Sequence, residues 1–195
     1  LEVGDIDVSL AHSSLPPGGG SGGSWGAPNT AVALHQACLR LVEQTGISPG
    51  PDFVKRALAA NPKGAVAKGE IQSAANTPDW DKKSRHTYGA HFVEVGIHEL
   101  TGEIRLRRML GVFSAGRILN PKTARSQLLG GMIWGVSAAI REVAEVDHRY
   151  GNIVNGDLAE YLVPVHADIP DVDVVLIGEP DLDANPVGVK GVGEL

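Results

Sequence analysis

Residues Tyr88–Val112 read YGAHFVEVGIHELTGEIRLRRMLGV, and their pattern decides the fold class. Apolar side chains recur at alternate positions in Tyr88–His98 and again in Ile104–Val112, and Thr101-Gly102 lies between the two runs. A period of two is typical of half-buried strands, and a glycine between two such runs is typical of a hairpin turn. We therefore predict an antiparallel β-hairpin in the centre of the chain.

A long helix is predicted after this hairpin. Gly116–Pro121 leaves the second strand, and Pro121 suits the first turn of a helix, where the N–H that proline lacks is not needed. We expect the helix to reach about Glu145, with an almost wholly apolar middle at Leu128–Ile140. Its glycines at 130, 131 and 135 each cost roughly 1 kcal/mol relative to alanine. They predict close packing against another backbone or a cofactor.

A glycine-rich loop precedes a second predicted helix. Residues 15–26 contain two prolines and six glycines, which is typical either of a flexible linker or of a loop whose N–H groups bind phosphate. The spacing matches neither a Walker nor a Rossmann motif. We expect the helix to start at Pro28–Thr30, with Asn29 or Thr30 as its cap, and to end at Gly46. Its predicted apolar stripe is Ala31, Leu34, Cys38, Leu41 and Val42.

The remaining segments complete a mixed pattern. We predict strands at Val3–Leu10 and Val172–Ile177, a short helix at Phe53–Ala60, and a short extended or turn-like piece at Asp157–Pro164. Residues 61–86 are polar without periodicity and are predicted to be a connector or mobile loop. Because strands and helices do not alternate regularly, the predicted fold class is α+β.

Composition narrows the function classes. The 195 residues are 43% hydrophobic and 21% charged, which is enough for one domain with its own core. A net charge of −6 argues against a nucleic-acid-binding surface, and the short run Arg105, Arg107 and Arg108 is predicted to be the solvent face of a strand. The single Cys38 excludes an internal disulfide and is predicted to lie in the core. No apolar stretch is long enough to predict a membrane span.

The last residues, KGVGEL at 190–195, bring one carboxylate beside two glycines. Gly191 and Gly193 allow another group to approach the backbone closely, so Glu194 can meet a ligand there. On its own, such a motif is more often a turn with a solvated carboxylate than a catalytic base. A salt bridge between Glu194 and Lys190 is a further structural alternative.

Several motifs occur together in a meaningful order. PPGGGSGGSW at 16–25, GRILNP at 116–121, QLLGGMIWG at 127–135, DLAEYLVP at 157–164 and GVGE at 191–194 follow one another. In this order the chain resembles the molybdenum-binding subunit of the xanthine dehydrogenase/aldehyde oxidase family, and it is most similar to the bacterial aldehyde oxidases. The resemblance covers nearly the whole chain. It implies that residues 1–195 are a C-terminal molybdopterin-binding domain, an incomplete fragment of a longer subunit, with the mixed helices and strands of that domain.

The resemblance also implies a reaction. In the family, molybdenum carried by a pterin hydroxylates an electrophilic carbon with oxygen derived from water, and a nearby glutamate acts as the general base; the cofactor supplies the redox step. Glu194 matches this base, and an apolar pocket shifts a carboxylate pKa upward, as the role requires. Gln127 resembles the glutamine that binds the pterin, and Arg117–Thr123 resembles the stretch at the pyrophosphate or nucleotide end, where Arg117 or Lys122 balances charge.

The site implied in this way consists of many residues and no protein metal ligand. The residues assigned to cofactor binding are Ser21, Gly22, Gly23, Arg117, Ile118, Leu119, Asn120, Pro121, Lys122, Thr123, Gln127, Lys190, Gly191, Val192 and Gly193.

The implied cofactor is molybdenum–molybdopterin, expected as its cytosine dinucleotide form. FAD and [2Fe–2S] clusters are expected on partner subunits, because the sequence has no cysteine cluster or flavin motif. The remainder of the molybdenum subunit is a further expected partner. The expected activity is oxidation of aldehydes to carboxylic acids. Three alternatives stay open: an N-heterocycle or xanthine dehydrogenase, a cofactor-free homologue acting as an interaction domain, and a phosphate-binding scaffold. The compartment, bacterial cytoplasm or periplasm, also stays open.

Overall fold

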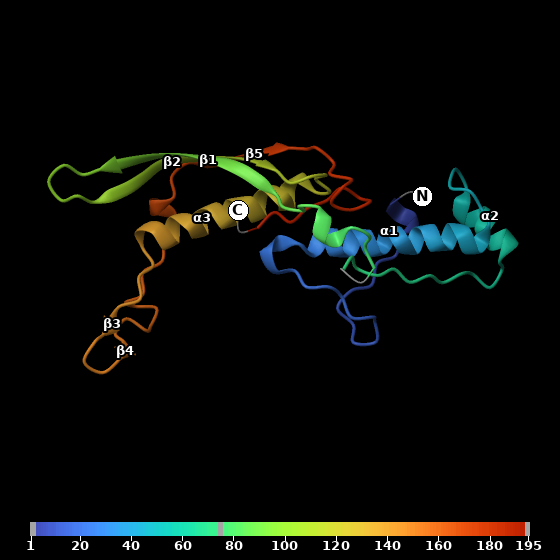
Figure 1. Ribbon diagram of the computed structural model, residues 1–195, viewed down its shortest axis with the longest axis horizontal. Helices are drawn as coiled ribbons and strands as arrows, with labels where there is room; N and C mark the ends of the chain where they lie inside the picture. Colours follow the sequence, from blue (N-terminus) through green and yellow to red (C-terminus); the bar gives the residue numbers. More distant parts are fainter. Residues whose placement is uncertain (1–2, 74–75, 194–195) are drawn as a thin grey trace.

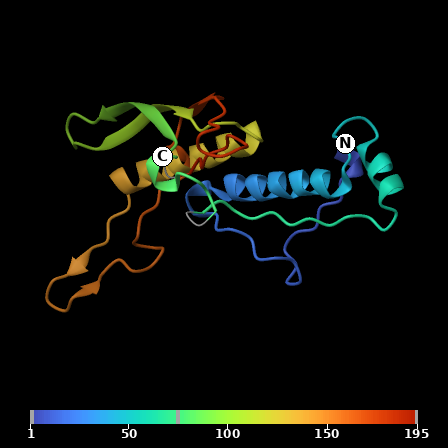
Figure 2. The ribbon, with the colours of Figure 1, turned by 45° about the vertical axis from the view of Figure 1, so that its right-hand side comes forward.

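The computed structural model describes residues 3–73 and 76–193 of the chain. The molecule is elongated (Figures 1 and 2): helices α1 (Gly26–Thr45) and α2 (Phe53–Ala60) lie toward one end, and a small sheet packed on helix α3 (Pro121–Ile140) forms the other. This mixture of helices and strands confirms the predicted α+β class. Among the described residues, we find no helix that has both the length and the apolar character needed to cross a membrane.

The predicted hairpin is confirmed. Strand β1 (Tyr88–Ile97) pairs antiparallel with β2 (Ile104–Ser114), and Gly102, with φ 71°, donates its N–H to the His98 carbonyl at 2.8 Å. The register shifts once, because Arg107 is an extra residue between the pairs Val95–Leu106 and Glu94–Arg108. The three arginines of this strand are exposed, as predicted.

The third strand of the sheet is β5 (Val172–Ile177), as predicted. It pairs parallel with β2, which gives the order β1-β2-β5 and makes β2 the central strand. One face of the sheet packs on α3, and the core there consists of Phe113, Leu128, Met132 and Val174. The parallel pairing requires a crossover, which α3 and the residues after it provide.

Helix α3 starts as predicted but ends earlier. Pro121 is its first residue, and the helix stops at Ile140 rather than near Glu145. The backbone beyond this point is bound by Asn155, whose side chain donates to the Val143 carbonyl at 2.7 Å and accepts from the Glu145 N–H at 2.8 Å. These bonds replace further helical ones. The chain then forms a small unpredicted hairpin of β3 (Val146–Asp147) and β4 (Asn152–Ile153), which projects from the body of the molecule (Figure 1).

Two of the three glycines of α3, Gly130 and Gly135, have no other part of the described chain close to them. A side-chain carbon built on Gly130 or Gly135 meets no atom within 4 Å. The helix buries a single face, formed by Leu128, Met132, Val136 and Ser137, while Trp134 on another face is 59% exposed. Gly130 and Gly135 are thus exposed positions of α3, whereas Gly131 is half-buried.

Helix α1 differs from its prediction at the start and agrees at the end. It begins at Gly26 without a side-chain cap, because the Asn29 amide instead donates to the Gly20 carbonyl at 2.7 Å. Gly46, with φ 66°, terminates it as predicted. Val32 is the buried residue of α1, whereas Leu34 and Cys38 are exposed, which corrects the predicted stripe and the predicted core position of Cys38.

The reason for this different face is the segment that follows α2. Arg40 donates to the Lys68 carbonyl at 2.5 Å, and Gln36 accepts from the Glu70 N–H at 3.1 Å. This extended segment covers the side of α1 that periodicity alone does not single out. Helix α2 matches its prediction, and residues 61–86 contain the short 3-10 turn η3 (Trp80–Lys82). The predicted strand at Val3–Leu10 is wrong: these residues form a 3-10 turn (Val3–Asp5) followed by exposed chain without strand pairing.

Candidate functional site

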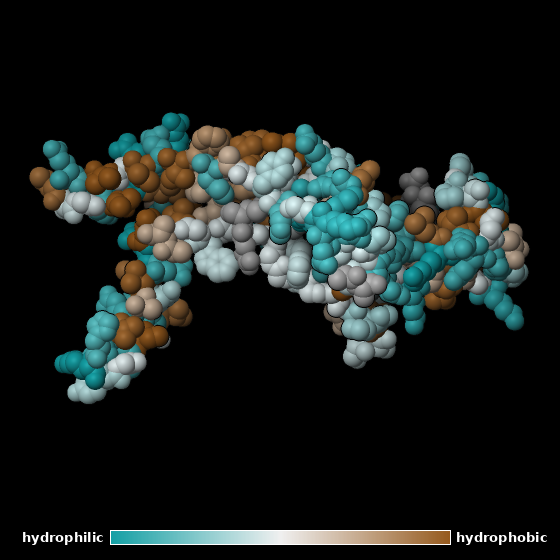
Figure 3. Space-filling model, in the orientation of Figure 1, coloured by the Kyte–Doolittle hydropathy of each residue, from teal (hydrophilic) through white to brown (hydrophobic). Residues whose placement is uncertain are grey.

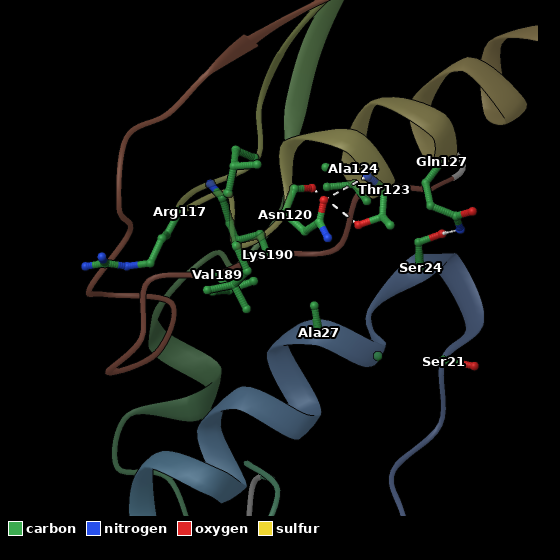
Figure 4. A pocket seen from close by; sticks show the side chains of 14 residues that line it. Ser21, Ser24, Ala27, Arg117, Asn120, Thr123, Ala124, Gln127, Val189 and Lys190 are labelled. Carbon is green, nitrogen blue, oxygen red and sulfur yellow. Dashed lines mark hydrogen bonds between the residues drawn. The ribbon is translucent and has the colours of Figure 1, made fainter. Parts of the chain in front are cut away.

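A cavity of about 350 Å³ lies where three distant segments meet (Figure 4). The glycine loop and the first turn of α1 form one wall, the start of α3 with the residues before it forms another, and the last described residues form the third. Its lining residues are Ser21, Ser24, Gly26, Ala27, Arg117, Ile118, Leu119, Asn120, Thr123, Ala124, Gln127, Val189, Lys190 and Val192.

The glycine loop enters the cavity in an uncommon conformation. Gly23 and Ser24 are both left-handed, with φ values of 59° and 56°. This is easy for glycine, whereas an L-residue with a side-chain carbon pays roughly 1–2 kcal/mol for it. The bond from Asn29 to the Gly20 carbonyl anchors the loop from the side of α1. The loop is thus an ordered wall of the cavity rather than a flexible linker.

The start of α3 supplies polar groups to the opposite wall. The Asn120 side chain caps the helix by accepting from the N–H groups of Lys122 at 3.1 Å and Thr123 at 3.2 Å. Arg117 is positioned by two bonds to the neighbouring loop: its N–H donates to the Gly188 carbonyl at 2.5 Å, and its Nε donates to the Val187 carbonyl at 2.8 Å. A helix N-terminus beside an exposed guanidinium favours an anionic group.

Gln127 and Ser24 join the two walls. Gln127 Nε2 donates to Ser24 Oγ at 2.5 Å, across 103 positions of sequence (Figure 4). The figure also shows Arg117 and Gln127 at opposite ends of the cavity. An amide and hydroxyl pair therefore lies at one end, and at the other end the Arg117 side chain extends away from the other labelled side chains.

The third wall packs directly on the glycine loop. The Gly193 N–H donates to the Gly23 carbonyl at 3.1 Å, and the Thr87 hydroxyl donates to the Gly191 carbonyl at 2.5 Å. A side-chain carbon on Gly193 would clash with the Ser24 hydroxyl. Glycine is thus required where this segment meets the loop, as the sequence motif predicts.

Asn185 organises the residues that lead into this wall. It is buried, its amide donates to the Val189 carbonyl at 2.6 Å, and its oxygen accepts from the N–H groups of Gly188 at 2.8 Å and Val187 at 3.1 Å. Gly116 lies against this loop so closely that any side chain there would clash with the Gly188 carbonyl. The loop is therefore fixed to the segment that carries Arg117.

Lys190 is buried and paired with an acidic residue. Its ammonium lies 3.1 Å from Asp181 Oδ2 and 5.6 Å from the centre of the Tyr88 ring. Partial burial raises the pKa of Asp181, but the hydrogen bond and charge of Lys190 outweigh it and hold that pKa below its usual value. Asp181 thus balances the Lys190 charge in the described structure.

The cavity brings together many of the residues that the sequence predicts. Glu194 lies outside the described residues. Gly22, Gly23, Pro121, Lys122, Gly191 and Gly193 adjoin the lining residues in the chain without lining the cavity themselves. Ser24, Gly26, Ala27, Ala124 and Val189 are lining residues that sequence reasoning missed; the predicted ones that line it are Ser21, Arg117, Ile118, Leu119, Asn120, Thr123, Gln127, Lys190 and Val192.

The donor set of the cavity suits an organic, anionic ligand better than a bare metal ion. Amide, hydroxyl, guanidinium and helix N-terminal groups surround it, and these groups bind phosphates and heterocycles. Over residues 3–73 and 76–193 there is no cluster of three or more His, Cys, Asp or Glu side chains that could hold a metal ion.

Comparison with known proteins agrees with this geometry. The family model of the molybdopterin cofactor-binding domain matches residues 1–170. The chain is 43% identical over 204 residues to the aldehyde oxidoreductase molybdenum-binding subunit PaoC of Escherichia coli K12, covering 97% of this chain and 28% of that subunit. It is 30% identical over 130 residues to the putative xanthine dehydrogenase molybdenum-binding subunit XdhA of the same organism, covering 66% of this chain and 16% of the relative.

A solved structure shows the same fold. The aldehyde oxidoreductase from Desulfovibrio desulfuricans superposes with a TM-score of 0.69 at 25% identity, covering 92% of this chain and 20% of that one. The chain thus spans between 16% and 28% of the length of these relatives. The family match covers most of the residues and includes the glycine loop and the start of α3. The chain belongs to the molybdopterin cofactor-binding domain family of the molybdenum-dependent oxidoreductases.

Proposed function

We propose that this chain is part of the molybdenum subunit of a hydroxylase that oxidises aldehydes to carboxylic acids with oxygen from water. The observation that carries the proposal is the cavity in which Gln127, Ser24 and the Arg117–Thr123 segment converge. The relative that is 43% identical is an aldehyde oxidoreductase subunit, and this supports the choice of aldehydes. A dehydrogenase of N-heterocycles is the second candidate, supported by the 30% identity to a putative xanthine dehydrogenase subunit.

The residues of the cavity fit molybdenum–molybdopterin. Gln127 and Ser24 offer an amide and a hydroxyl to the pterin, and Arg117 with the start of α3 offers positive charge to the phosphates. The group would supply the two-electron redox chemistry, while the protein binds and orients it. The two glycines at 191 and 193 leave room for the close contact between the third wall and the loop.

We also propose Glu194 as the general base that accepts the proton released during hydroxylation. It follows Gly193, whose backbone is bonded to the glycine loop at the Gln127 end of the cavity. The role requires a carboxylate whose pKa is matched to neutral pH. The resemblance to the family implies that the electrons would leave through [2Fe–2S] clusters to FAD, on partner subunits or on other parts of a longer chain.

The test is the cofactor content of the full-length molybdenum subunit, purified with its partner subunits. We expect near-stoichiometric molybdenum by elemental mass spectrometry and CMP among the products of acid hydrolysis, which identifies the cytosine dinucleotide form. CMP absent beside molybdenum would identify the mononucleotide form. Absence of both, with maturation factors supplied, would contradict the proposal and favour a cofactor-free homologue.

Two single-residue variants test whether the cofactor binds in this cavity. Gln127→Ala removes the amide that joins the two walls, so we expect it to retain less cofactor. Ser126→Ala changes an exposed residue of the same helix that does not line the cavity, and we expect wild-type content. Equal content in the two variants would place the cofactor elsewhere.

A further inference from the structure

We propose that Ser24 is the positioning residue of this site: its hydroxyl orients the Gln127 amide and seats the Gly193 backbone, so that both are held ready for the ligand. The inference rests on the proposed function for the identity of the ligand. Ser24 is absent from the residues that the sequence assigns to the site.

The first observation is the contact that Ser24 makes with Gln127. Ser24 Oγ accepts a hydrogen bond from Gln127 Nε2 at 2.5 Å. The hydroxyl therefore engages the nitrogen of the amide and not its oxygen. The Gln127 carbonyl oxygen then remains as the acceptor that it can offer to a ligand. Gln127 is exposed on the first turns of α3, and an exposed glutamine samples several rotamers unless a partner holds it.

The second observation is the backbone of Ser24 itself. With φ 56° it occupies the left-handed region, where serine is disfavoured relative to glycine. Five of the six residues from 18 to 23 are glycines, so a glycine at position 24 would match the composition of the loop and fit this conformation without strain. A strained residue kept at such a position is a reason to look for a role of its side chain.

The third observation places Ser24 against the other wall. The Gly193 N–H bonds to Gly23, the residue before Ser24, and any side chain on Gly193 would collide with the Ser24 hydroxyl. The Ser24 hydroxyl therefore bonds to α3 and lies next to the position that a side chain on Gly193 would occupy. A displacement of Ser24 would alter both the amide at one wall and the backbone that precedes Glu194.

Ser24→Ala and Ser24→Gly separate this role from a merely structural one. Both remove the hydroxyl, but only the glycine variant relieves the left-handed strain. If the side chain positions Gln127, both variants release the cofactor about tenfold faster than wild type, the size expected for one lost hydrogen bond. If Ser24 only shapes the backbone, Ser24→Gly behaves like wild type, which would overturn the proposal.

The double variant tests whether Ser24 acts through Gln127. The release rate is followed by pterin fluorescence in the full-length subunit with its partners, for wild type, Ser24→Ala, Gln127→Ala and the double variant. We expect the double variant to release cofactor at the rate of Gln127→Ala alone, because the two changes remove the same interaction. Additive effects of the two changes would contradict the proposal. Ser126→Ala is the matched control with a wild-type rate.

Hydrogen exchange gives a readout that does not need the cofactor. In the same subunit stripped of cofactor, Ser24→Ala and Ser24→Gly should both speed exchange in peptides that cover residues 20–27 and 188–193. Unchanged exchange in both variants would overturn the proposal even if the wild-type subunit bound no cofactor. If the wild-type subunit bound no cofactor but both variants exchanged faster, the proposed function would be contradicted. The positioning role of Ser24 would still be supported.

Discussion

Individual residues define this site through contacts that span almost the whole sequence. Gln127 reaches Ser24 across 103 positions, and Gly193 bonds to Gly23. Each contact depends on a specific chemical property: an amide that donates, a hydroxyl that accepts, and a glycine without a side-chain carbon. Single substitutions at these positions are therefore expected to act on ligand binding or turnover more than on the fold.

Glu194→Gln is expected to separate binding from turnover. Glutamine keeps the size and polarity of glutamate but cannot accept the proton that a general base takes up. We expect normal molybdenum content and a loss of at least 100-fold in turnover with aldehydes, within the range that general-base catalysis contributes. Steady-state assays and elemental analysis of the same preparation measure both; turnover near wild type would disprove the base role.

The Asp181–Lys190 pair is expected to make stability depend on acid pH. The pKa of Asp181 lies below its unfolded value, so the contribution of the pair is present above about pH 4 and is lost as the pH falls through the folded pKa. Asp181→Asn leaves the Lys190 ammonium, 6% exposed, without a counter-charge. We expect a loss of roughly 2–3 kcal/mol at pH 7, below the range for fully buried pairs because Asp181 is 28% exposed.

Thermal unfolding between pH 2 and pH 7 measures this effect. The unfolding temperature of Asp181→Asn should fall less on acidification than that of wild type. Asp183→Asn is the matched control, because Asp183 pairs with Lys83 at the surface and is 79% exposed. We expect its effect to stay below about 1 kcal/mol. Equal losses in the two variants would show that burial of Lys190 does not matter.

The residues that line the cavity lie at the ends of helices and in the loops beside them, not in the middles of helices or strands. The cavity lies at the N-termini of α1 and α3, where the helix dipoles favour negative charge. The central strand β2 leads directly into the segment 116–120, so the sheet fixes where α3 begins. The start of α3, capped by Asn120, thus links the sheet to the cavity.

Asn120→Ala is expected to weaken that start. The variant loses the two bonds from the Asn120 side chain to the N–H groups of Lys122 and Thr123. Loss of such a cap costs about 1 kcal/mol of unfolding free energy. Denaturant unfolding measures it, and Asn120→Asp, which retains a capping oxygen, should remain within a few tenths of a kcal/mol of wild type. A loss of equal size in both variants would contradict capping as the cause.

The whole molecule carries more apolar surface than its own core covers. Opposite pairs in the sheet place Phe92 with Leu110 and Val112 with Val175 on the face away from α3, and Phe92 and Val175 are 61% and 46% exposed. Figure 3 shows hydrophobic residues gathered over this region. Contiguous patches of this kind are typical of interfaces or of aggregation-prone surfaces.

The chain of residues 1–195 on its own is therefore expected to self-associate through the sheet. Phe92→Thr with Val175→Thr keeps the preference for strands but removes apolar surface, so it should lower the mass measured by light scattering at a given concentration. Val66→Thr, at a position that is 84% exposed and far from the sheet in sequence, is the control that should not change association. Unchanged mass in the double variant would show that another surface drives association.

The sequence by itself determined most of the local elements and many of the residues that line the cavity. Alternation predicted the hairpin, and the Gly46 and Pro121 signals predicted a helix end and a helix start, because periodicity and backbone restrictions act over a few residues. The resemblance of the motifs to a known family predicted nine of the lining residues. Tertiary structure alone decided the parallel pairing of β2 with β5, the buried face of α1, the end of α3 at Ile140 and the Ser24–Gln127 contact. These features depend on which distant segments meet, and no local pattern of side chains encodes that meeting.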